Sequence, residues 1–488
     1  MEPRELFHIS CYVLLFLACV LVFTTIRSRR VRQTILLVSS FALYLTWTPW
    51  FAAVLAASII VNFLIGKWLQ RNPHWVPLSA GIVFNLALLS VFKYVPELAA
   101  HVASGTLRGF ADLALPLGIS FWTFQAMSYL FDIYRDQELD PSLTEFALYM
   151  AFFPVTISGP VCRMPEMLPQ LHSEEKTTGA DILTGLRRIA IGVLMMQIAK
   201  LLGQGILAGD GIVSGFDRTS QWSATDAWCL AFGYGLQLFF DFAGYTHIAV
   251  GAAKALGITI PENFERPFSS ASPSVFWTRW HMSLSFWIRD YLFFPLATAR
   301  REIWWRNLAL IFSMAAFGVW HRASLLFLIW GCYHGVLLVA HRLIQQWERH
   351  SNWQPPENVW SALGWLATAI FISLGWIFFR ANSLVQADQM LATIFSPAAY
   401  LKHFLSPSLY ALVAVIAAGY AIVLLIALAL EKQIKDAYTK ERPDSAIALL
   451  ARWRWFWIPS LYALALLFVF MITHGQQASA GQLMYRRF

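Results

Sequence analysis

Apolar runs of about 20 residues recur along this chain, and this feature limits its possible folds more than any other. A helix needs a run of roughly that length to cross the hydrocarbon core of a bilayer. The runs lie near residues 7–26, 34–48, 49–65, 78–95, 144–160, 182–206, 225–257, 304–320, 322–344, 358–380, 407–430 and 454–473. The sequence therefore predicts an all-α, multi-pass membrane protein with about eleven spanning helices.

The charge content supports a lipid environment. Hydrophobic residues make up 58% of the 488 residues and charged residues 13%, about half the charged share of an average soluble domain. The net charge is +8, and basic residues such as Arg29 and Arg30 sit at the ends of apolar runs, where they can meet anionic headgroups. This pattern indicates contact with membrane lipid and argues against a nucleic-acid partner.

Two stretches do not read as simple spans. Residues 116–134 carry Pro116, Gly118, Gln125 and Asp132, and residues 258–298 mix aromatic with polar groups. We expect re-entrant or interfacial elements there, within one membrane-embedded domain over residues 1–488. The basic residues at 27–32 and at 67 and 71 follow the first and third runs, so both loops should face the cytoplasm.

Three clusters of polar residues at membrane depth need an explanation, because an ionisable group there costs a few kcal/mol. In the first cluster, Gln237, Asp241 and Tyr245 recur every four residues and should share one helical face. Asp241 either takes part in a site or is buried structurally against Arg279 or Arg289.

The second cluster spans residues 276–291. Read as one helix, it places His281, Ser285 and Arg289 on one side, followed by Asp290. Taken alone, His281 is more simply explained as a hydrogen-bonded histidine in an aromatic environment.

The third cluster is Trp320-His321-Arg322, inside a run that should lie in the bilayer. A neutral imidazole is cheaper to bury than a carboxylate and can move protons near neutral pH. The five cysteines are scattered singly, and no phosphate loop or metal-binding spacing occurs, so we expect no metal and histidine-based chemistry.

Seven short segments, in order, carry a resemblance to a known family. They are Leu115–Phe121, Phe153-Pro154 with Ser158–Val161, Phe240–Tyr245, Pro261–Phe264 with Arg266–Phe268, Trp277–His281, Arg289–Tyr291, and Trp320-His321. Over residues 116–345 the chain resembles the membrane-bound O-acyltransferase family, in its bacterial branch of alginate O-acetylation proteins and related polysaccharide acetyltransferases. Residues 280–287 are also similar to the branch that transfers D-alanine to teichoic acids.

The resemblance implies tilted helices around a central tunnel in a bacterial inner membrane. It implies that His321 is the catalytic histidine and that His281 occupies the second polar position. Two positions depart from the family pattern: Arg322 stands where the family usually has glycine, and His247 where it usually has an acidic residue. Arg322 would limit how closely a substrate approaches from its side, and it would be suited to binding a phosphate or carboxylate.

From this resemblance we expect an O-acyltransferase that moves an acyl group, with acetyl favoured, from a cytosolic thioester to a hydroxyl of a surface polysaccharide. The donor would be acetyl-CoA or an acyl carrier, with no bound cofactor, and the partner a periplasmic protein with a serine-hydrolase-like fold. His321 would accept the hydroxyl proton, and His281 or a backbone N–H would stabilise the oxyanion. The residues expected to shape the tunnel are Gln237, Asp241, Tyr245, Ser285, Arg289, Asp290, Trp320 and Arg322.

Three alternatives remain open. The first is D-alanyl transfer to teichoic acid, and the second is a covalent acyl intermediate, for example on a serine of the partner. The third, from another class, is a transporter of glycans or lipid-linked sugars, which would favour internal repeats that this sequence does not show.

Overall fold

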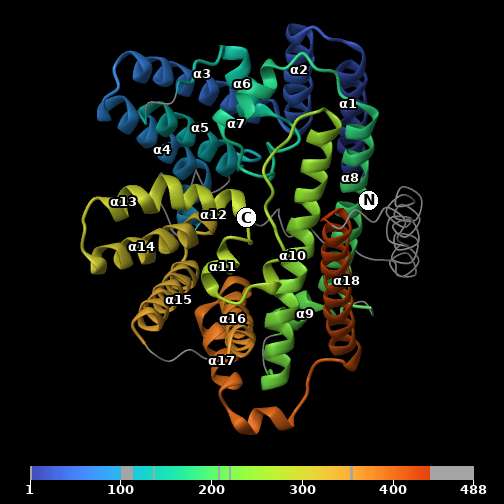
Figure 1. Ribbon diagram of the computed structural model, residues 1–488, viewed down its shortest axis with the longest axis vertical. Helices are drawn as coiled ribbons and strands as arrows, with labels where there is room; N and C mark the ends of the chain where they lie inside the picture. Colours follow the sequence, from blue (N-terminus) through green and yellow to red (C-terminus); the bar gives the residue numbers. More distant parts are fainter. Residues whose placement is uncertain are drawn as a thin grey trace. The chain divides into compact units, whose positions relative to one another are not determined.

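The computed structural model describes residues 3–100, 114–135, 138–206, 209–218, 221–351 and 356–439. Within these ranges the regular structure is helical, and the only β pairing is an isolated bridge between Phe264 and Trp280 (Figure 1). The chain divides into two compact units. Unit 1 comprises residues 1–189, 245–265 and 280–324, and unit 2 comprises residues 190–244, 266–279 and 325–488. That residues 1–488 act as one domain stays a prediction.

Unit 1 is built from the N-terminal helices and a later group of short helices. Its helices are α1 (Pro3–Thr25), α2 (Arg29–Trp47), α3 (Pro49–Arg71), α4 (Trp75–Ala100), α5 (Ile119–Tyr134), α6 (Leu143–Ala151), α7 (Met164–His172), α12 (Met282–Trp287), the π-helix η3 (Ile288–Phe293), α13 (Phe294–Thr298) and α14 (Ile303–His321). The helix α5 forms much of the core of this unit, since nearly all of its side chains are buried. Close packing requires a glycine at position 66, where a Cβ would lie 2.6 Å from the Tyr129 ring.

Unit 2 contains most of the later helices. They are α9 (Ile212–Asp217), η2 (Pro267–Ser269), α11 (Pro273–Trp277), α15 (Leu325–His350), α16 (Glu357–Arg380), α17 (Leu384–Ile394), η4 (Pro397–Leu401) and α18 (Pro407–Thr439). Two helices, α8 (Gly179–Gln204) and α10 (Ala224–Ala255), contribute residues to both units.

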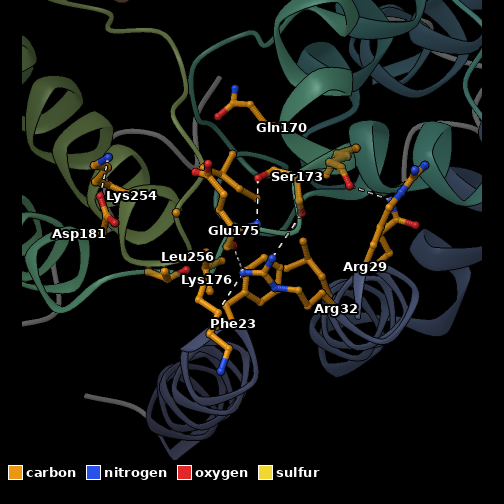
Figure 2. A pocket seen from close by; sticks show the side chains of 16 residues that line it. Phe23, Arg29, Arg32, Gln170, Ser173, Glu175, Lys176, Asp181, Lys254 and Leu256 are labelled. Carbon is orange, nitrogen blue, oxygen red and sulfur yellow. Dashed lines mark hydrogen bonds and ion pairs between the residues drawn. The ribbon is translucent and has the colours of Figure 1, made fainter. Parts of the chain in front are cut away.

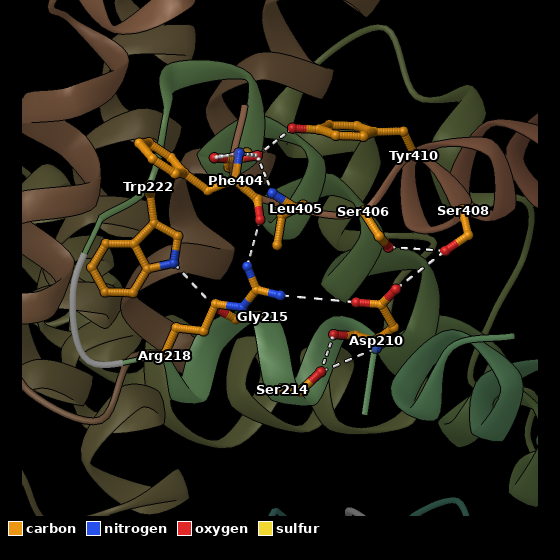
Figure 3. Close-up of polar contacts among 12 residues, drawn as sticks. Asp210, Ser214, Gly215, Arg218, Trp222, Phe404, Leu405, Ser406, Ser408 and Tyr410 are labelled. Carbon is orange, nitrogen blue, oxygen red and sulfur yellow. Dashed lines mark hydrogen bonds and ion pairs between the residues drawn. The ribbon is translucent and has the colours of Figure 1, made fainter. Parts of the chain in front are cut away.

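Polar contacts in unit 2 hold the segment before α18 against α9 and the start of α10 (Figure 3). Arg218 donates to the carbonyl oxygen of Phe404 at 2.6 Å, and Ser408 donates to Asp210 at 3.3 Å. The carboxylate of Asp226 accepts the backbone N–H groups of Phe404 and Leu405, both at 3.1 Å. Because these contacts satisfy backbone groups outside any helix, they fix where α18 begins.

Among the residues that the structure describes, seven helices are long and apolar enough to cross a membrane, which confirms a multi-pass membrane protein. They are α3, α4, α8, α14, α15, α16 and α18, and residues Ser10–Thr25 of α1 form a shorter apolar helix. The predicted span at 454–473 lies outside the described residues, and the total of about eleven stays a prediction.

The predicted span at 144–160 is wrong. Its helix, α6, covers only nine residues and is followed by turns from Phe153. Pro154 disfavours helical backbone at the residue before it, and the Phe153 N–H donates instead to Ser40 Oγ at 3.3 Å. An apolar run interrupted in this way cannot extend across a bilayer.

Neither of the two stretches set apart from the simple spans forms a helix long enough to cross a bilayer, and their re-entrant or interfacial nature stays a prediction. The helix α5 has 16 residues, or about 24 Å, which is shorter than a hydrocarbon core of ~30 Å. Residues 258–298 break into short helices, α11 to α13, with η2 and η3 among them.

The two basic loops lie at the same end of unit 1. Arg29 forms an ion pair with Glu145, and Lys67 forms one with Asp140 five residues earlier. This arrangement agrees with the prediction that both loops share one side of the membrane.

Candidate active site

His321 is the last residue of α14. Its imidazole centre lies 4.8 Å from the Phe317 ring centre and 4.7 Å from that of Trp320. The helix ends here because Arg322 takes up an extended conformation. Trp320 is buried, whereas His321 is partly exposed. The imidazole therefore packs against two aromatic rings, in a residue that keeps some exposure.

His281 lies in the break between α11 and α12, in a left-handed backbone conformation with φ of +46°. Asn263 binds the two residues that follow His281. The Asn263 carbonyl oxygen accepts the Met282 N–H at 2.9 Å, and the Asn263 side-chain oxygen accepts the Ser283 hydroxyl at 2.6 Å. The side chain of His281 is only 3% exposed. This burial lowers the pKa of His281 to about 3, so the imidazole is neutral at physiological pH.

The two histidines meet in unit 1. His281 and Lys93 both lie within electrostatic range of His321, although they come from different parts of the chain. Two imidazoles and a lysine are thus collected at the end of α14. Such a set can accept a proton and stabilise a developing negative charge.

Lys93 was not among the residues predicted for the site. It lies on α4, with its ammonium 4.7 Å from the centre of the Trp320 ring and 3.5 Å from Ser120 Oγ. The sequence did contain a signal, namely a single lysine in the apolar run 78–95. The predicted site depended on clusters of polar residues, and an isolated lysine does not form such a cluster.

The side chain of Arg322 turns toward α4. Its Nε lies 2.7 Å from Glu97 Oε1, and the guanidinium is largely exposed. Tyr94, on the same helix, donates to the carbonyl oxygen of Trp320 at 3.5 Å. The end of α14 is therefore anchored to the last turns of α4, and Arg322 forms part of its solvent-accessible rim.

The expectation of one continuous helix over residues 276–291 is wrong. The positive φ at His281 breaks it, so His281 does not share a helical face with Ser285 and Arg289. The Ser285 hydroxyl donates to the Trp280 carbonyl oxygen at 3.0 Å. Asn263 contacts and the Phe264–Trp280 bridge stabilise the break, and neither is visible as a local pattern.

Arg289 and Asp290 lie in the π-helix η3 and belong to an ion-pair network. Asp290 pairs with Arg289 and with Arg163, each at 2.7 Å. Burial opposes ionisation of Asp290, but the two guanidinium groups outweigh it and lower its pKa. This network stabilises the packing of η3 in unit 1, and a direct role in the site stays a prediction.

Gln237, Asp241 and Tyr245 lie on the continuous helix α10 and share a face, as expected. Gln237 and Asp241 belong to unit 2, whereas Tyr245 belongs to unit 1 with the two histidines. Asp241 is buried, and its Oδ2 has no hydrogen-bond partner within the described ranges. Arg279, in the same unit, donates instead to Ser269 Oγ at 2.9 Å, so its expected pairing with Asp241 is not observed, and the alternative pairing with Arg289 stays untested.

Comparison with known proteins finds a single family of acyltransferases. The family model described as the membrane-bound O-acyltransferase family matches residues 35–385. A probable alginate O-acetylase of Azotobacter vinelandii is 32% identical over 404 residues, covering 80% of this chain and 78% of the relative. A peptidoglycan O-acetyltransferase of Helicobacter pylori is 32% identical over 394 residues, covering 73% and 72%. A teichoic acid D-alanyltransferase of Bacillus subtilis is 32% identical over 277 residues, covering 54% of this chain and 69% of the relative.

Proposed function

Because the chain belongs to the membrane-bound O-acyltransferase family, we propose that it moves an acetyl group from a cytosolic thioester to a hydroxyl of an exported polysaccharide. The enzyme is a multi-pass membrane protein, and its bacterial relatives favour the inner membrane as its location. Acetyl is favoured over D-alanyl because the acetylase relatives match 73–80% of this chain, whereas the D-alanyltransferase of Bacillus subtilis matches 54%.

One observation carries the proposal: His321, partly exposed at the end of α14, has both His281 and Lys93 within electrostatic range. These three residues all lie inside the part of the chain that the family model matches. A structural histidine would not require a second buried imidazole and a cation beside it at membrane depth.

The reaction is acyl transfer by direct attack. The acceptor hydroxyl attacks the thioester carbonyl carbon as its proton passes to neutral His321, and a C–O bond forms. Negative charge develops on the carbonyl oxygen, where the Lys93 ammonium and an N–H of His281 can stabilise it. The C–S bond then breaks, His321 returns the proton to the departing sulfur, and the products are an ester and a free thiol.

The donor and acceptor reach the site from opposite sides of the membrane in this proposal. A passage through the protein joins them without moving the whole donor across the bilayer. A periplasmic partner with a serine-hydrolase-like fold would receive or position the acetyl group beyond the passage. If that partner supplies a serine, the first acceptor hydroxyl is that serine and the chemistry at His321 is unchanged.

The test compares surface glycans from cells that carry the intact gene, a deletion, and His321→Ala. We expect mass spectrometry to show an ester-linked acetyl group that is lost in the deletion and in His321→Ala. His74→Ala is the matched control, because His74 lies in an exposed loop. Unchanged acetylation in His321→Ala, at equal protein level, contradicts the proposal.

A purified-protein assay separates the enzyme from a transporter. The enzyme releases free thiol from an acyl thioester in the presence of acceptor, and His321→Ala should lower this rate by about a hundredfold to ten-thousandfold. Movement of glycan across vesicles without ester formation favours the transporter instead.

A further inference from the structure

A cavity of about 190 Å³ lies at the end of unit 1 that carries the basic loops (Figure 2). The last turn of α1, the first turns of α2, the segment after α7 and the end of α10 form its walls. It is larger than the ~150 Å³ cavity that accommodates benzene in an engineered protein. Four basic residues line it, namely Arg29, Arg32, Lys176 and Lys254.

Arg32 is the central feature of this cavity, because it is a buried cation without an anion. It is 5% exposed, and its guanidinium lies 4.5 Å from the Phe23 ring centre. It donates to the carbonyl oxygens of Phe23 (3.0 Å), Ser173 (3.4 Å) and Glu175 (2.6 Å). No carboxylate pairs with it in the described part of the chain, and its Nε has no hydrogen-bond partner there. Neutral carbonyls offset only part of the cost of burying this charge.

The remaining charges leave the cavity basic. Lys254 is paired with Asp181 at 2.7 Å, and Arg29 with Glu145. Lys176 is exposed and makes no ion pair within the described ranges, and the one unpaired carboxylate in the lining is that of Glu175, also exposed. The buried part of the cavity thus contains a cation, and its rim contains one charge of each sign.

Thr177 supplies a second buried polar group. It is 7% exposed, and its hydroxyl oxygen has no hydrogen-bond partner among the described residues. Its backbone N–H is held by the Phe23 carbonyl oxygen at 3.2 Å. Gly257 has φ of +74°, and a Cβ there would lie 2.9 Å from the hydroxyl oxygen. A glycine at this position keeps space open beside the hydroxyl.

We propose that this cavity binds a phosphate group. A phosphate presents several oxygen acceptors to the remaining N–H groups of Arg32, to the Lys176 ammonium and to the Thr177 hydroxyl. Arginine matches phosphate geometry well. The group can belong to a phospholipid headgroup, to a phosphate-bearing thioester donor, or to free phosphate. The site is distinct from the histidine site and does not depend on the proposed reaction.

The test uses the full-length protein, purified in a phosphate-free maltoside detergent and stripped of lipid. The thermal unfolding midpoint is measured against inorganic phosphate, coenzyme A and short-chain phosphatidylglycerol. At least one of these probes should raise the midpoint of the wild type. Lys176→Gln and Thr177→Val should weaken the apparent affinity about tenfold, the effect of losing one hydrogen bond to a charged group. Arg30→Gln is the matched control, since it removes an exposed charge from the same helical turn.

Thr177→Val gives the sharpest result. Without a ligand, its midpoint should equal or exceed that of the wild type, because the substitution removes a buried hydroxyl that has no partner. Arg32→Gln also removes bonds to three carbonyls, so the decision rests on the other two variants. Competition identifies the source: displacement of phosphatidylglycerol by coenzyme A indicates the donor, and binding of phosphatidylglycerol alone indicates a lipid. The proposal is overturned if no probe shifts the wild type, or if both variants retain the full shift.

Discussion

The ammonium group of Lys93 lies 4.7 Å from the centre of the ring of Trp320, the residue that immediately precedes His321 in the sequence. A lysine in a spanning helix costs a few kcal/mol, whereas a cation–π contact returns only about 0.5 to 2 kcal/mol. The contact with Trp320 therefore does not by itself explain the presence of Lys93. The charge of Lys93 also acts electrostatically on His321, which is the ionisable group beside it.

Lys93→Met is expected to lower kcat/KM about 10- to 100-fold, the effect of losing a charge-assisted hydrogen bond at the developing oxyanion. The unfolding midpoint should stay the same or rise, because a charged group is removed from a spanning helix. Lys93→Arg keeps the charge and should retain most of the activity. Full thioester turnover by purified Lys93→Met would remove this residue from the site.

His281→Asn tests the second histidine without breaking the backbone. Asparagine is among the residues that best tolerate a left-handed conformation, so the turn at φ of +46° should persist. We expect a loss of about 10²- to 10³-fold in kcat, as for removal of one oxyanion donor. A variant with normal kcat would show that the buried imidazole is only structural.

The same variant has a predicted pH dependence. The pKa of His281 is lowered from 6.5 to about 3 by burial, so the unfolded chain binds more protons than the folded one between these values. Wild-type stability should therefore fall as pH drops from about 6.5 toward 3, and His281→Asn should lose that part of the decline. Activity profiles of the two proteins between pH 5 and 8 should be parallel, because His281 does not titrate in that range.

Local sequence was sufficient for most of the fold. The spans α3, α4 and α14 to α16 follow from length and hydropathy alone, since both properties belong to single segments. The failure at residues 144–160 arose because Pro154 interrupts the run and Ser40, far away in the chain, accepts the freed backbone N–H.

The site was predictable residue by residue but not as an arrangement. His281 and His321 each stood out as ionisable groups in apolar surroundings. The two histidines approach each other because of the contacts of Asn263 and the turn at His281. Sequence periodicity predicted a helix in place of this turn. Long-range packing of this kind leaves no pattern within a single window of sequence.

Glu145 is expected to be a strong determinant of stability. It is 3% exposed and bonds to Arg29, His172 and Gln33. Burial opposes its ionisation, but hydrogen bonds from Ser142 and Arg29 outweigh it and lower the pKa of Glu145 to about 2.

Glu145→Gln should cost about 1 to 3 kcal/mol at pH 7, as expected when a charged hydrogen-bond partner is removed from buried surroundings. Because the folded pKa is below the unfolded value of 4.5, the stabilisation is present above pH 4.5 and lost as pH falls toward 2. The difference in stability between wild type and Glu145→Gln should shrink over the same pH range.

Asp140→Asn is the control: Asp140 pairs with Lys67 but is 80% exposed, so its loss should cost less than ~1 kcal/mol. Equal effects in thermal unfolding would contradict this assignment.

The resemblance to the family implies a glycine where this chain has Arg322, and we expect Arg322 to influence acceptor choice. Its side chain is 58% exposed and pairs with Glu97 at 2.7 Å, and the residue directly follows His321 in the sequence. Arg322→Gly should raise KM for an acidic polysaccharide about 1.4- to fivefold, the equivalent of ~0.2 to 1 kcal/mol for an exposed charge pair. KM for a neutral acceptor and kcat should change little, because the guanidinium does not contact the reacting atoms.

Glu97→Gln should have the opposite effect and lower KM for the acidic acceptor. Both effects should fade at high salt, where exposed charges are screened. A loss of kcat in Arg322→Gly with both acceptors would instead place the guanidinium in the chemical step.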